Sequence, residues 1–557
     1  MNKSNTFSGN DVPKLTKILF PWSGIFRDAC YSLIGTFLMQ YAITAGVLST
    51  DAAQFKAQYG VITVAMIIAL VWDGINDPIM GFLLEKCHFK AGKFRPWIEI
   101  GAIGNAFAVL AMFVTPMIFT GLRGWGYVVF MIIMYVLWDV FFTMNDIGYW
   151  SMLPALTSDP EQRAKLTTTT AIAASIGTFI MNIAMFVLPG TFSGSTMQIY
   201  AYAGLTVATL FLLTQTIVFL KCKEKERDSE QEEISENSSI LDLFRVVAKN
   251  KQLLFAVIGL LLYYFASMII TGIGQNYFYM VFGYGGNKGG IIASIIAVVY
   301  IMATIFAQAF YPMLSKKMSR EKIITISGVI ILVAYIMFFF IGFPVFGELP
   351  LAYNTPTESI LWAFGGTMSL YYICAFLFFG GSGIYYLAIL VMFQDAIDYN
   401  EYEYGERKES ICFAWRALNV KLASGLNRAL QYITYALSGT MFFINKVSDE
   451  EGNYNALIQD KSLSASQIET LTANRDSAIE LSRVTIDKNQ LTVFGIIIIS
   501  VILVCFIVSY CVLHFGYNID EEKEKMIVEE LERRHKQNEE KKANLQTETN
   551  NEIKQEG

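Results

Sequence analysis

Five aspartates lie inside long apolar stretches in the first half of this 557-residue chain: Asp28, Asp73, Asp77, Asp139 and Asp146. A charged side chain in the middle of a bilayer costs about 2.5–3.5 kcal/mol on insertion scales, so such residues indicate a functional site. Asp73 and Asp77 are four residues apart and therefore project from one face of a helix. Asp139 and Asp146 are seven apart and nearly share a face, with Thr143 between them. Two helices can thus present two to four carboxylates and a hydroxyl to one cavity.

A carboxylate cluster of this kind cannot stay ionised and unpaired in a low-dielectric interior. It must take up protons or a cation, or pair with basic groups. Hard cations prefer oxygen ligands, which Asp and Thr supply. We therefore expect the cluster to bind a coupling ion. The competing interpretation is a structural network, in which for example Arg27 neutralises its neighbour Asp28.

Basic residues inside one apolar run of the second half are candidate counter-ions. Lys421 lies in the middle of that run, flanked by Arg416 and Arg428. We expect Lys421 to be a counter-ion to the acidic cluster. The structural interpretation of the two arginines is that they snorkel to the membrane surface, or that they are tied to Asp395 and Asp398 at the end of the neighbouring run.

Two aromatic residues, Tyr149 and Trp150, follow Asp146 by one helical turn. A planar ring beside a carboxylate suits a sugar, whose apolar face stacks on the ring while its hydroxyls form hydrogen bonds. Aromatic residues near helix ends also serve as interfacial anchors, so this pattern alone does not decide between the two roles.

The composition indicates which elements hold these residues in place. Apolar residues make up 54% of the chain and charged residues only 16%, against roughly 25% charged in soluble proteins. A bilayer core of about 30 Å needs roughly 20 apolar residues per spanning helix. Twelve runs meet this requirement, at about 22–48, 59–84, 98–120, 125–150, 168–189, 198–220, 252–281, 290–313, 323–346, 368–397, 411–440 and 490–516.

A polar stretch in the middle divides the chain into two halves of six spans each. The expected segments are an N-terminal six-helix bundle with the cation site (1–221), a cytosolic central loop (222–251), a C-terminal six-helix bundle (252–516) that includes a long extracytoplasmic loop (445–490), and a cytosolic tail (517–557). Most of the 42 Lys and Arg residues fall on the side of the two termini. The positive-inside rule therefore places both termini in the cytosol.

Two soluble appendages show helical patterns. The 445–490 loop contains a possible capping box that begins at Ser464 and ends at Gln467. In the tail, Met526, Ile527 and Leu531 lie on one helical face. We expect the tail helix to rest on the cytosolic face of the protein.

Catalytic and redox signatures are few. None of the seven cysteines forms a CxxC pair, and the three histidines are far apart. The chain has no Walker-type loop, no HExxH and no GxSxG motif. The first apolar run has no cleavage site typical of a signal peptide. We therefore expect neither an enzyme, nor a disulfide framework, nor a nucleic-acid-binding protein.

The run WDGINDPIMGFLLEKCHFKAGKFRPW (72–97) closely resembles the signature of the glycoside–pentoside–hexuronide:cation symporter family. This is the branch of the major facilitator superfamily that includes melibiose permease. Three further pieces follow the family's order: Arg27-Asp28, TMNDIGYWSMLPAL (143–156), and DAIDYNEY (395–402) through Lys421. The resemblance covers all twelve runs and excludes the 445–490 loop. It implies an all-α membrane protein with twelve transmembrane helices in two pseudo-symmetric six-helix bundles.

The resemblance also implies roles for individual residues. It assigns the cation site to Asp73, Asp77, Thr143 and Asn76, with Na⁺ at Asp73 and Asp77 and with Asp146 shared between cation and sugar. It assigns sugar contacts to Arg27, Asp28 and Trp150, and a basic residue near the site to Lys421. The pattern departs from the family at Ala171, Ala417 and Asp139, so the sugar pocket is altered and melibiose is not inferred as the substrate.

The function implied is symport of a sugar (glycoside, oligosaccharide, pentoside or hexuronide) with Na⁺, or with H⁺ or Li⁺, by alternating access. We expect a monomer in the plasma membrane that needs no cofactor besides the coupling cation. Basic residues of the 85–97 loop, Lys93 and Arg95, are expected to help lock the cytosolic side. The alternatives are a carrier of another amphipathic solute or lipid, since folds host varied cargo, and a sugar sensor that transports nothing.

Overall fold

The structure is a computed structural model. It describes residues 6–7, 12–86, 89, 91–119, 121–157, 160–191, 194–225, 240–284, 289–345, 363–364, 366–405, 409–458, 463–531, 533–534 and 537.

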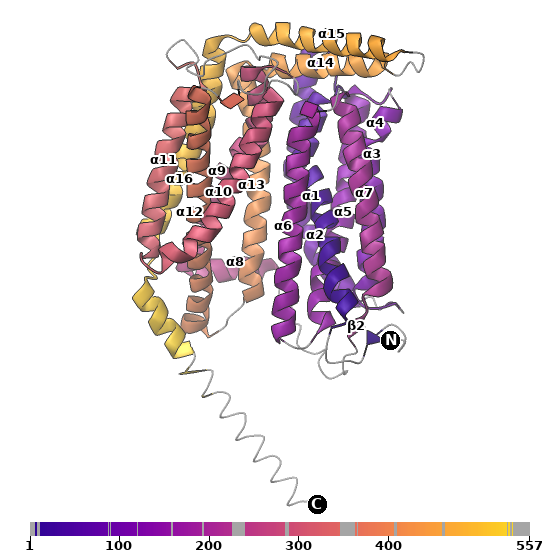
Figure 1. Ribbon diagram of the computed structural model, residues 1–557. Helices are drawn as coiled ribbons and strands as arrows, with labels where there is room; N and C mark the ends of the chain where they lie inside the picture. The colour runs from indigo at the N-terminus through magenta and orange to yellow at the C-terminus, as the bar shows by residue number, and fades with distance from the viewer. Residues whose placement is uncertain are drawn as a thin grey trace, which may run out of the picture.

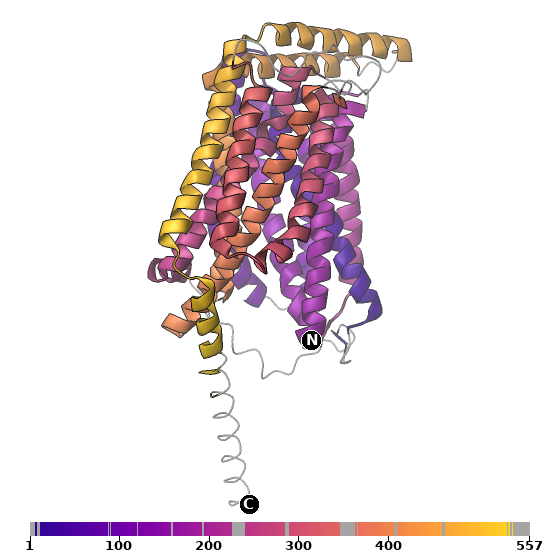
Figure 2. The same ribbon diagram turned by 60° about the vertical axis from the view of Figure 1, so that its left-hand side comes forward.

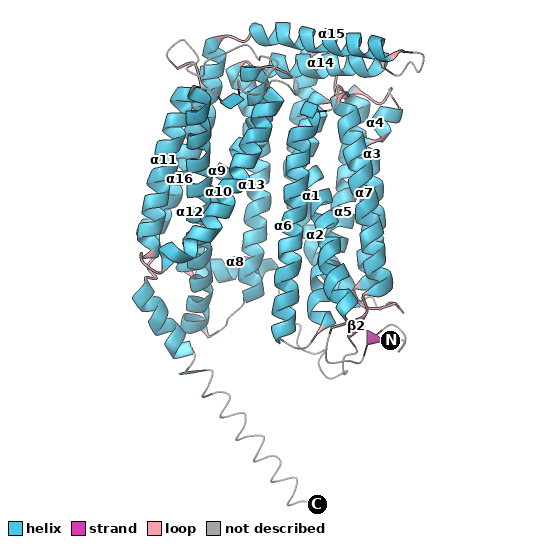
Figure 3. Ribbon diagram, viewed as in Figure 1, coloured by secondary structure: helices cyan, strands magenta, loops and turns pink. Residues whose placement is uncertain are grey.

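Nearly all of the described chain is helical, as the secondary-structure colouring shows (Figure 3). The helices are α1 (Lys14–Thr44), α2 (Ala52–Lys86), α3 (Arg95–Phe113), α4 (Thr115–Ile118), α5 (Gly124–Leu156), α6 (Pro160–Thr191), α7 (Thr196–Lys221), α8 (Ile240–Lys249), α9 (Lys251–Phe282), α10 (Gly289–Ser315), α11 (Arg320–Gly342), α12 (Thr367–Tyr404), α13 (Glu409–Ser438), α14 (Met441–Leu457), α15 (Ala465–Val484) and α16 (Lys488–Gly516). Two short strands, β1 (Thr6–Phe7) and β2 (Glu224–Lys225), pair in parallel.

Ten helices of the described chain are long and apolar enough to cross a membrane. Two more, α1 with 31 residues and α13 with 30, run beside them (Figure 1). These two are not among the ten because charged and polar side chains interrupt their apolar surface. Several of those side chains are candidate site residues of the sequence analysis. With these two, the bundle has the twelve long helices that the sequence predicts.

The long helices form two groups that stand side by side (Figure 1). In the first group, α1 packs on α6 and α7, and α5 packs on α2 and α3. In the second group, α12 packs on α10 and α11, and α9 packs on α13 and α16. The groups touch where α6 meets α10 and where α2 meets α13. A cavity between the groups is therefore bounded by helices from both halves of the chain.

The contact between α1 and α6 depends on Gly177. A Cβ atom at this position would lie 1.8 Å from the backbone oxygen of Ile25. Gly177→Ala is therefore expected to force the two helices apart and to cost about 3 kcal/mol or more of stability. The matched control is Gly126→Ala in α5, where a Cβ would meet nothing within 4 Å and is expected to be neutral or slightly stabilising. Apparent melting temperatures in detergent compare the two; equal values would contradict the close approach.

The segment after α13, expected as a loop with one helix, contains two. Helices α14 and α15 lie across one end of the bundle in both views (Figures 1 and 2). The capping box is confirmed, since Gln467 N donates to Ser464 Oγ and Ser464 N donates to Gln467 Oε1. Helix α14 has few long apolar residues, so it was not visible as an apolar run. Together α14 and α15 are called the hairpin below.

The hairpin is joined to the first half of the chain by backbone contacts. Asn455 Nδ2 donates to Ala45 O at 3.2 Å, and Arg123 Nη2 donates to Gly452 O at 2.9 Å. Gly46 has a φ of +72°, and a Cβ there would lie 2.3 Å from Gly452 N. Two backbones therefore meet with no side chain between them.

A buried ion pair ties the hairpin to both halves. Glu451, only 1% exposed, pairs with Arg475 at 3.2 Å. Its carboxylate also accepts from Tyr284 Oη at 2.5 Å, just beyond α9, and from Thr196 N at 2.9 Å, in the first turn of α7. Burial alone would lower the pKa of Arg475, but Glu451, Tyr284 and Asp476 together outweigh it and the pKa is raised. Arg475 therefore stays charged.

The opposite end of the bundle carries both β1 and the helix over 521–531 (Figure 1). Ile527 and Leu531 are buried, whereas Met526 is exposed. Arg320 at the start of α11 pairs with Glu524, which fixes this helix to the bundle. The tail helix thus rests on the bundle through two of the three apolar residues expected.

Candidate functional site

Arg27 joins the acidic residues of α1 and α5. It is 3% exposed, and its Nε and Nη2 atoms donate to Asp28 Oδ2 at 3.0 and 2.8 Å. Its Nη1 atom donates to Asp146 Oδ1 at 2.5 Å. A buried charge is tolerated only when it is paired and hydrogen-bonded. The structure thus brings together three of the predicted substrate residues. The competing interpretation, a network with a purely structural role, requires the same ion pairs.

Two aromatic rings lie against this arginine. The Arg27 Cζ atom lies 4.6 Å from the ring centre of Tyr149 and 5.2 Å from that of Trp150. Tyr149 is fully buried, stacks on Phe20 and donates its hydroxyl to Phe20 O at 2.6 Å. Trp150 is only partly buried. In this conformation Tyr149 supports Arg27 from inside the protein, and Trp150 is the ring that a solute can reach.

The predicted cation residues come from α2 and α5, which pack together. Asn76 and Thr143 are both buried. One turn further along, Met80 of α2 packs near Met144 and Ile147 of α5. The side chains of Asp73 and Asp77 lie outside the described residues. Among the side chains that the structure does describe, no group of three acidic, histidine or cysteine residues could hold a metal ion. The cation site therefore stays a prediction.

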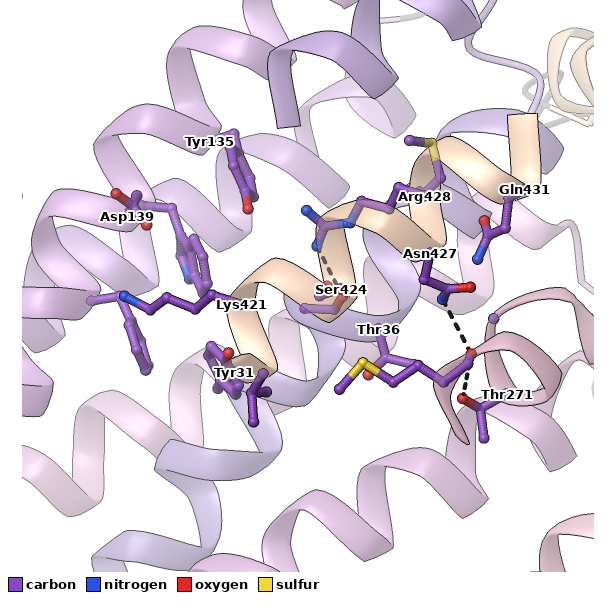
Figure 4. A pocket seen from close by; sticks show the side chains of 17 residues that line it. Tyr31, Thr36, Tyr135, Asp139, Thr271, Lys421, Ser424, Asn427, Arg428 and Gln431 are labelled. Carbon is purple, nitrogen blue, oxygen red and sulfur yellow. Dashed lines mark hydrogen bonds between the residues drawn. The ribbon is translucent and has the colours of Figure 1, made fainter. Parts of the chain in front are cut away.

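A cavity of about 190 Å³ lies between the two halves, lined by α1, α5, α9 and α13 (Figure 4). Asp139, which is buried, and Lys421 both line it. Asp139 of the first half and Lys421 of the second half thus face the same cavity. The volume is below the roughly 300–1,000 Å³ of drug-sized ligand pockets, as suits a small polar solute or a closed conformation.

One wall of this cavity is aromatic and was missed by the sequence analysis. Tyr31 stacks on Phe142 with ring centres 4.7 Å apart, and Trp138 lies 5.2 Å from Phe142 and 5.6 Å from Tyr135. Flat rings of this kind suit the apolar face of a sugar. The sequence does carry a signal for this wall. Tyr135, Trp138 and Phe142 are spaced by three to four residues, so they continue the helix face of Asp139 and Asp146 toward the start of α5.

The other wall comes from α13, where the two arginines are not placed as expected. Arg416 bonds to the hydroxyls of Tyr264 and Tyr386. Arg428 donates from Nη2 to Gly35 O at 3.1 Å. Within the described chain neither arginine pairs with Asp395 or Asp398, and Asp395 instead pairs with Arg320. The structural alternative of a tie to these carboxylates is therefore wrong, because Arg416 contacts α9 and the middle of α12, and Arg428 contacts α1.

The predicted gating residues hold the start of α3 to the end of α7. Arg95 donates from Nε to Phe219 O at 2.8 Å and from Nη1 to Ala91 O at 3.0 Å. The Glu224 carboxylate accepts from the backbone N–H groups of residues 93–95. For this loop, every contact given by the described residues stays within the first half or reaches β2 at the start of the central segment. In this conformation Arg95 satisfies the Phe219 carbonyl group in the last turn of α7.

Arg95→Ala is expected to change the rate of transport far more than the affinity for substrate, because Arg95 lies at the end of the bundle and away from the cavity. Lys165→Ala is the matched control, since Lys165 is exposed near the start of α6 and lies outside the predicted gating loop. Transport rates and binding constants measured on the same preparations separate the two effects. Unchanged rates with weakened binding would refute the expectation.

Comparisons with known proteins give a matching family and similar sequences. A family model described as "MFS/sugar transport protein" matches residues 36–454. The raffinose carrier protein of Pediococcus pentosaceus is 24% identical over 421 residues, which are 74% of this chain and 61% of that protein. The isoprimeverose transporter of Lactiplantibacillus pentosus is 23% identical over 440 residues, 77% of this chain and 81% of that protein. The chain spans about three fifths of the length of the first relatives it matches.

Two solved structures share the fold. A bacterial homologue of the human lysosomal transporter Spinster, inward-facing and unoccupied, has a TM-score of 0.53 at 12% identity, covering 90% of this chain and 96% of that one. A D-xylose–proton symporter has a TM-score of 0.51 at 12% identity, covering 81% and 98%. At this identity the likeness concerns the arrangement of helices alone.

Proposed function

Because this chain belongs to the MFS/sugar transport protein family, in the glycoside–pentoside–hexuronide branch that its sequence resembles, we propose that it is a secondary active symporter that imports a sugar. The family is one of transporters rather than enzymes. The observation that carries the proposal is the cavity between the two halves, with aromatic rings on one side and polar groups from α13 on the other. The protein acts as a multi-pass membrane protein, and we place both termini in the cytosol.

In the proposed cycle a cation, Na⁺ or H⁺ or Li⁺, binds at Asp73 and Asp77 with help from Asn76, Thr143 and Asp146. Asp146 lies outside the lining of the central cavity, but its side chain is 35% exposed, and in this cycle it is shared by the cation and the sugar. A cation that draws on the Asp146 carboxylate weakens its hold on Arg27. Arg27 and Asp28 then become available to sugar hydroxyls. Binding of either ligand thus favours binding of the other, which is what coupling requires.

The loaded carrier then moves between states open to opposite sides, as one half rocks against the other around the cavity. Lys421 contributes positive charge to the cavity from the second half. A carrier holding one ligand alone moves poorly, because the Arg27 network is satisfied only when both ligands or neither is present. The cation gradient supplies the driving force, and differential affinity between states permits the coupling.

A second candidate function is transport of an amphipathic lipid. A groove of about 470 Å³ lies between α6, α9 and α10, and it shares Thr36, Met268 and Thr271 with the central cavity. Most of its lining is apolar. An acyl chain in this groove with its polar head in the cavity would suit such a cargo.

The deciding experiment is uptake into proteoliposomes of labelled glycosides and pentosides, driven by inward Na⁺ or H⁺ gradients. We expect one sugar to follow one cation gradient, and Asp77→Asn to abolish that dependence. Glu469→Gln, an exposed carboxylate of α15, is the matched control and should transport normally. Folded protein that moves no sugar but exchanges lysolipids would support the second candidate. Sugar binding without uptake of any solute would indicate a sensor.

A further inference from the structure

Arg428 is a buried arginine in the central cavity that the cycle above does not use. It is 7% exposed and lies near the middle of α13. Its one hydrogen bond is from Nη2 to Gly35 O of α1, and no described carboxylate lies within ion-pair distance of it. Figure 4 shows its guanidinium group pointing into the space that Tyr135 also faces.

A guanidinium group has five N–H donors in a fixed plane, and a single carbonyl leaves most of them unused. Burying such a charge without a counter-charge is costly. The position is therefore suited to a ligand that brings the missing negative charge. A carboxylate fits best, because it accepts two parallel hydrogen bonds from one guanidinium.

The remaining cavity groups suit the neutral part of a sugar. Asn427 and Gln431 lie one turn or less from Arg428, and the buried Asn427 Oδ1 atom has no hydrogen-bond partner within the described chain. In Figure 4 these amides lie at one end of the cavity, Asp139 and Lys421 lie at the other, and the Arg428 guanidinium lies between them. A sugar whose carboxylate binds Arg428 can therefore place its neutral hydroxyls against the amides, on the side away from Asp139.

We propose that Arg428 binds the carboxylate of an acidic sugar, and that it makes the carrier selective for sugar acids and uronides over their neutral counterparts. This inference rests on the proposed function and names the substrate class of the same cavity. The simpler role for Arg428 is a structural tie from α13 to Gly35 of α1. A structural tie affects all substrates alike, whereas a carboxylate contact affects only acidic ones.

The test compares matched pairs in proteoliposomes: methyl glucuronide against methyl glucoside, and methyl galacturonide against methyl galactoside. We expect the wild-type protein to prefer the acidic member of a pair. Arg428→Gln should raise KM for the acidic sugar about tenfold or more and leave the neutral one within about twofold. Arg428→Lys, which keeps the charge without the fork, should fall between them. Arg416→Gln, outside the cavity, is the matched control.

Three outcomes overturn the inference. Wild-type uptake of neutral sugars alone overturns it and leaves sugar transport standing. An equal loss for both members of a pair in Arg428→Gln indicates the structural tie. No uptake of either class by folded wild-type protein overturns this inference and the proposed function together. If Arg428→Gln does not fold, the wild-type preference and Arg428→Lys decide.

Discussion

Asp146→Asn is expected to reduce cation-driven sugar uptake by about 100-fold or more. The substitution removes the negative charge of a carboxylate that accepts a hydrogen bond from Arg27. We propose that the cation and the sugar share this carboxylate. Each charge-assisted hydrogen bond is worth about 1.5–3 kcal/mol, and two of them correspond to a factor of about 100 or more in rate or affinity. Initial uptake rates under a fixed cation gradient measure the effect. Asp449→Asn, in an ion pair on the hairpin surface, is the matched control.

The same variant separates coupling from scaffolding. Because Asp146 is 35% exposed, losing its pair should cost less stability than the about 3–5 kcal/mol of a fully buried pair. A variant that melts close to wild type and yet does not transport supports the coupling role. Normal coupled uptake with a lower melting temperature would show that the Arg27 network is only structural.

Glu451→Gln is expected to be the most destabilising change in the hairpin, at about 3 kcal/mol, because it removes the buried carboxylate partner of Arg475 and leaves only the half-exposed Asp476 as a counter-charge. The matched control is the adjacent Glu450→Gln. Glu450 pairs with the half-exposed Lys446 at 2.6 Å, and exposed pairs of this kind are worth about 0–1 kcal/mol. Apparent melting temperatures in detergent, read with and without lipid, compare the two variants.

A double variant tests the origin of that loss. Glu451→Gln combined with Arg475→Met removes both charges, so it should be more stable than Glu451→Gln alone. Additive losses would contradict a direct ion pair and point to packing around Tyr284 instead. Equal melting temperatures for Glu451→Gln and Glu450→Gln would show that the hairpin is not held by this buried pair.

Much of the fold could be predicted because a bilayer leaves few choices. Each spanning helix must satisfy its own backbone and reach across the apolar core, so length and composition give its position directly. The predicted ends were less accurate. Helix α1 begins at Lys14 rather than near 22, and α6 at Pro160 rather than near 168. Helices continue into the polar surface region, where an apolar run no longer marks them.

The charged part of the site could be predicted for the same reason. Arg27, Asp28 and Asp146 stand out in apolar sequence, and the structure joins them in one network. The aromatic wall was harder to predict, because the spacing of Trp138 and Phe142 is common among membrane aromatics, and only the stacking of Tyr31 of α1 on Phe142 shows that they face a cavity. The surroundings of Arg428 depend on contacts between residues nearly 400 positions apart, such as that with Gly35. Helical periodicity gives no information about such contacts.

The meeting of Gly46 and Gly452 bears on how this face of the protein can open. Because the two backbones touch with no flexible side chain between them, the contact is either formed or broken. No intermediate distance preserves part of it. Packed surfaces of this kind tend to have two stable arrangements rather than a continuous range. The hairpin should therefore separate from the bundle in a single step. A distance probe across it would record two discrete populations whose ratio shifts with ligand, and not one population that drifts.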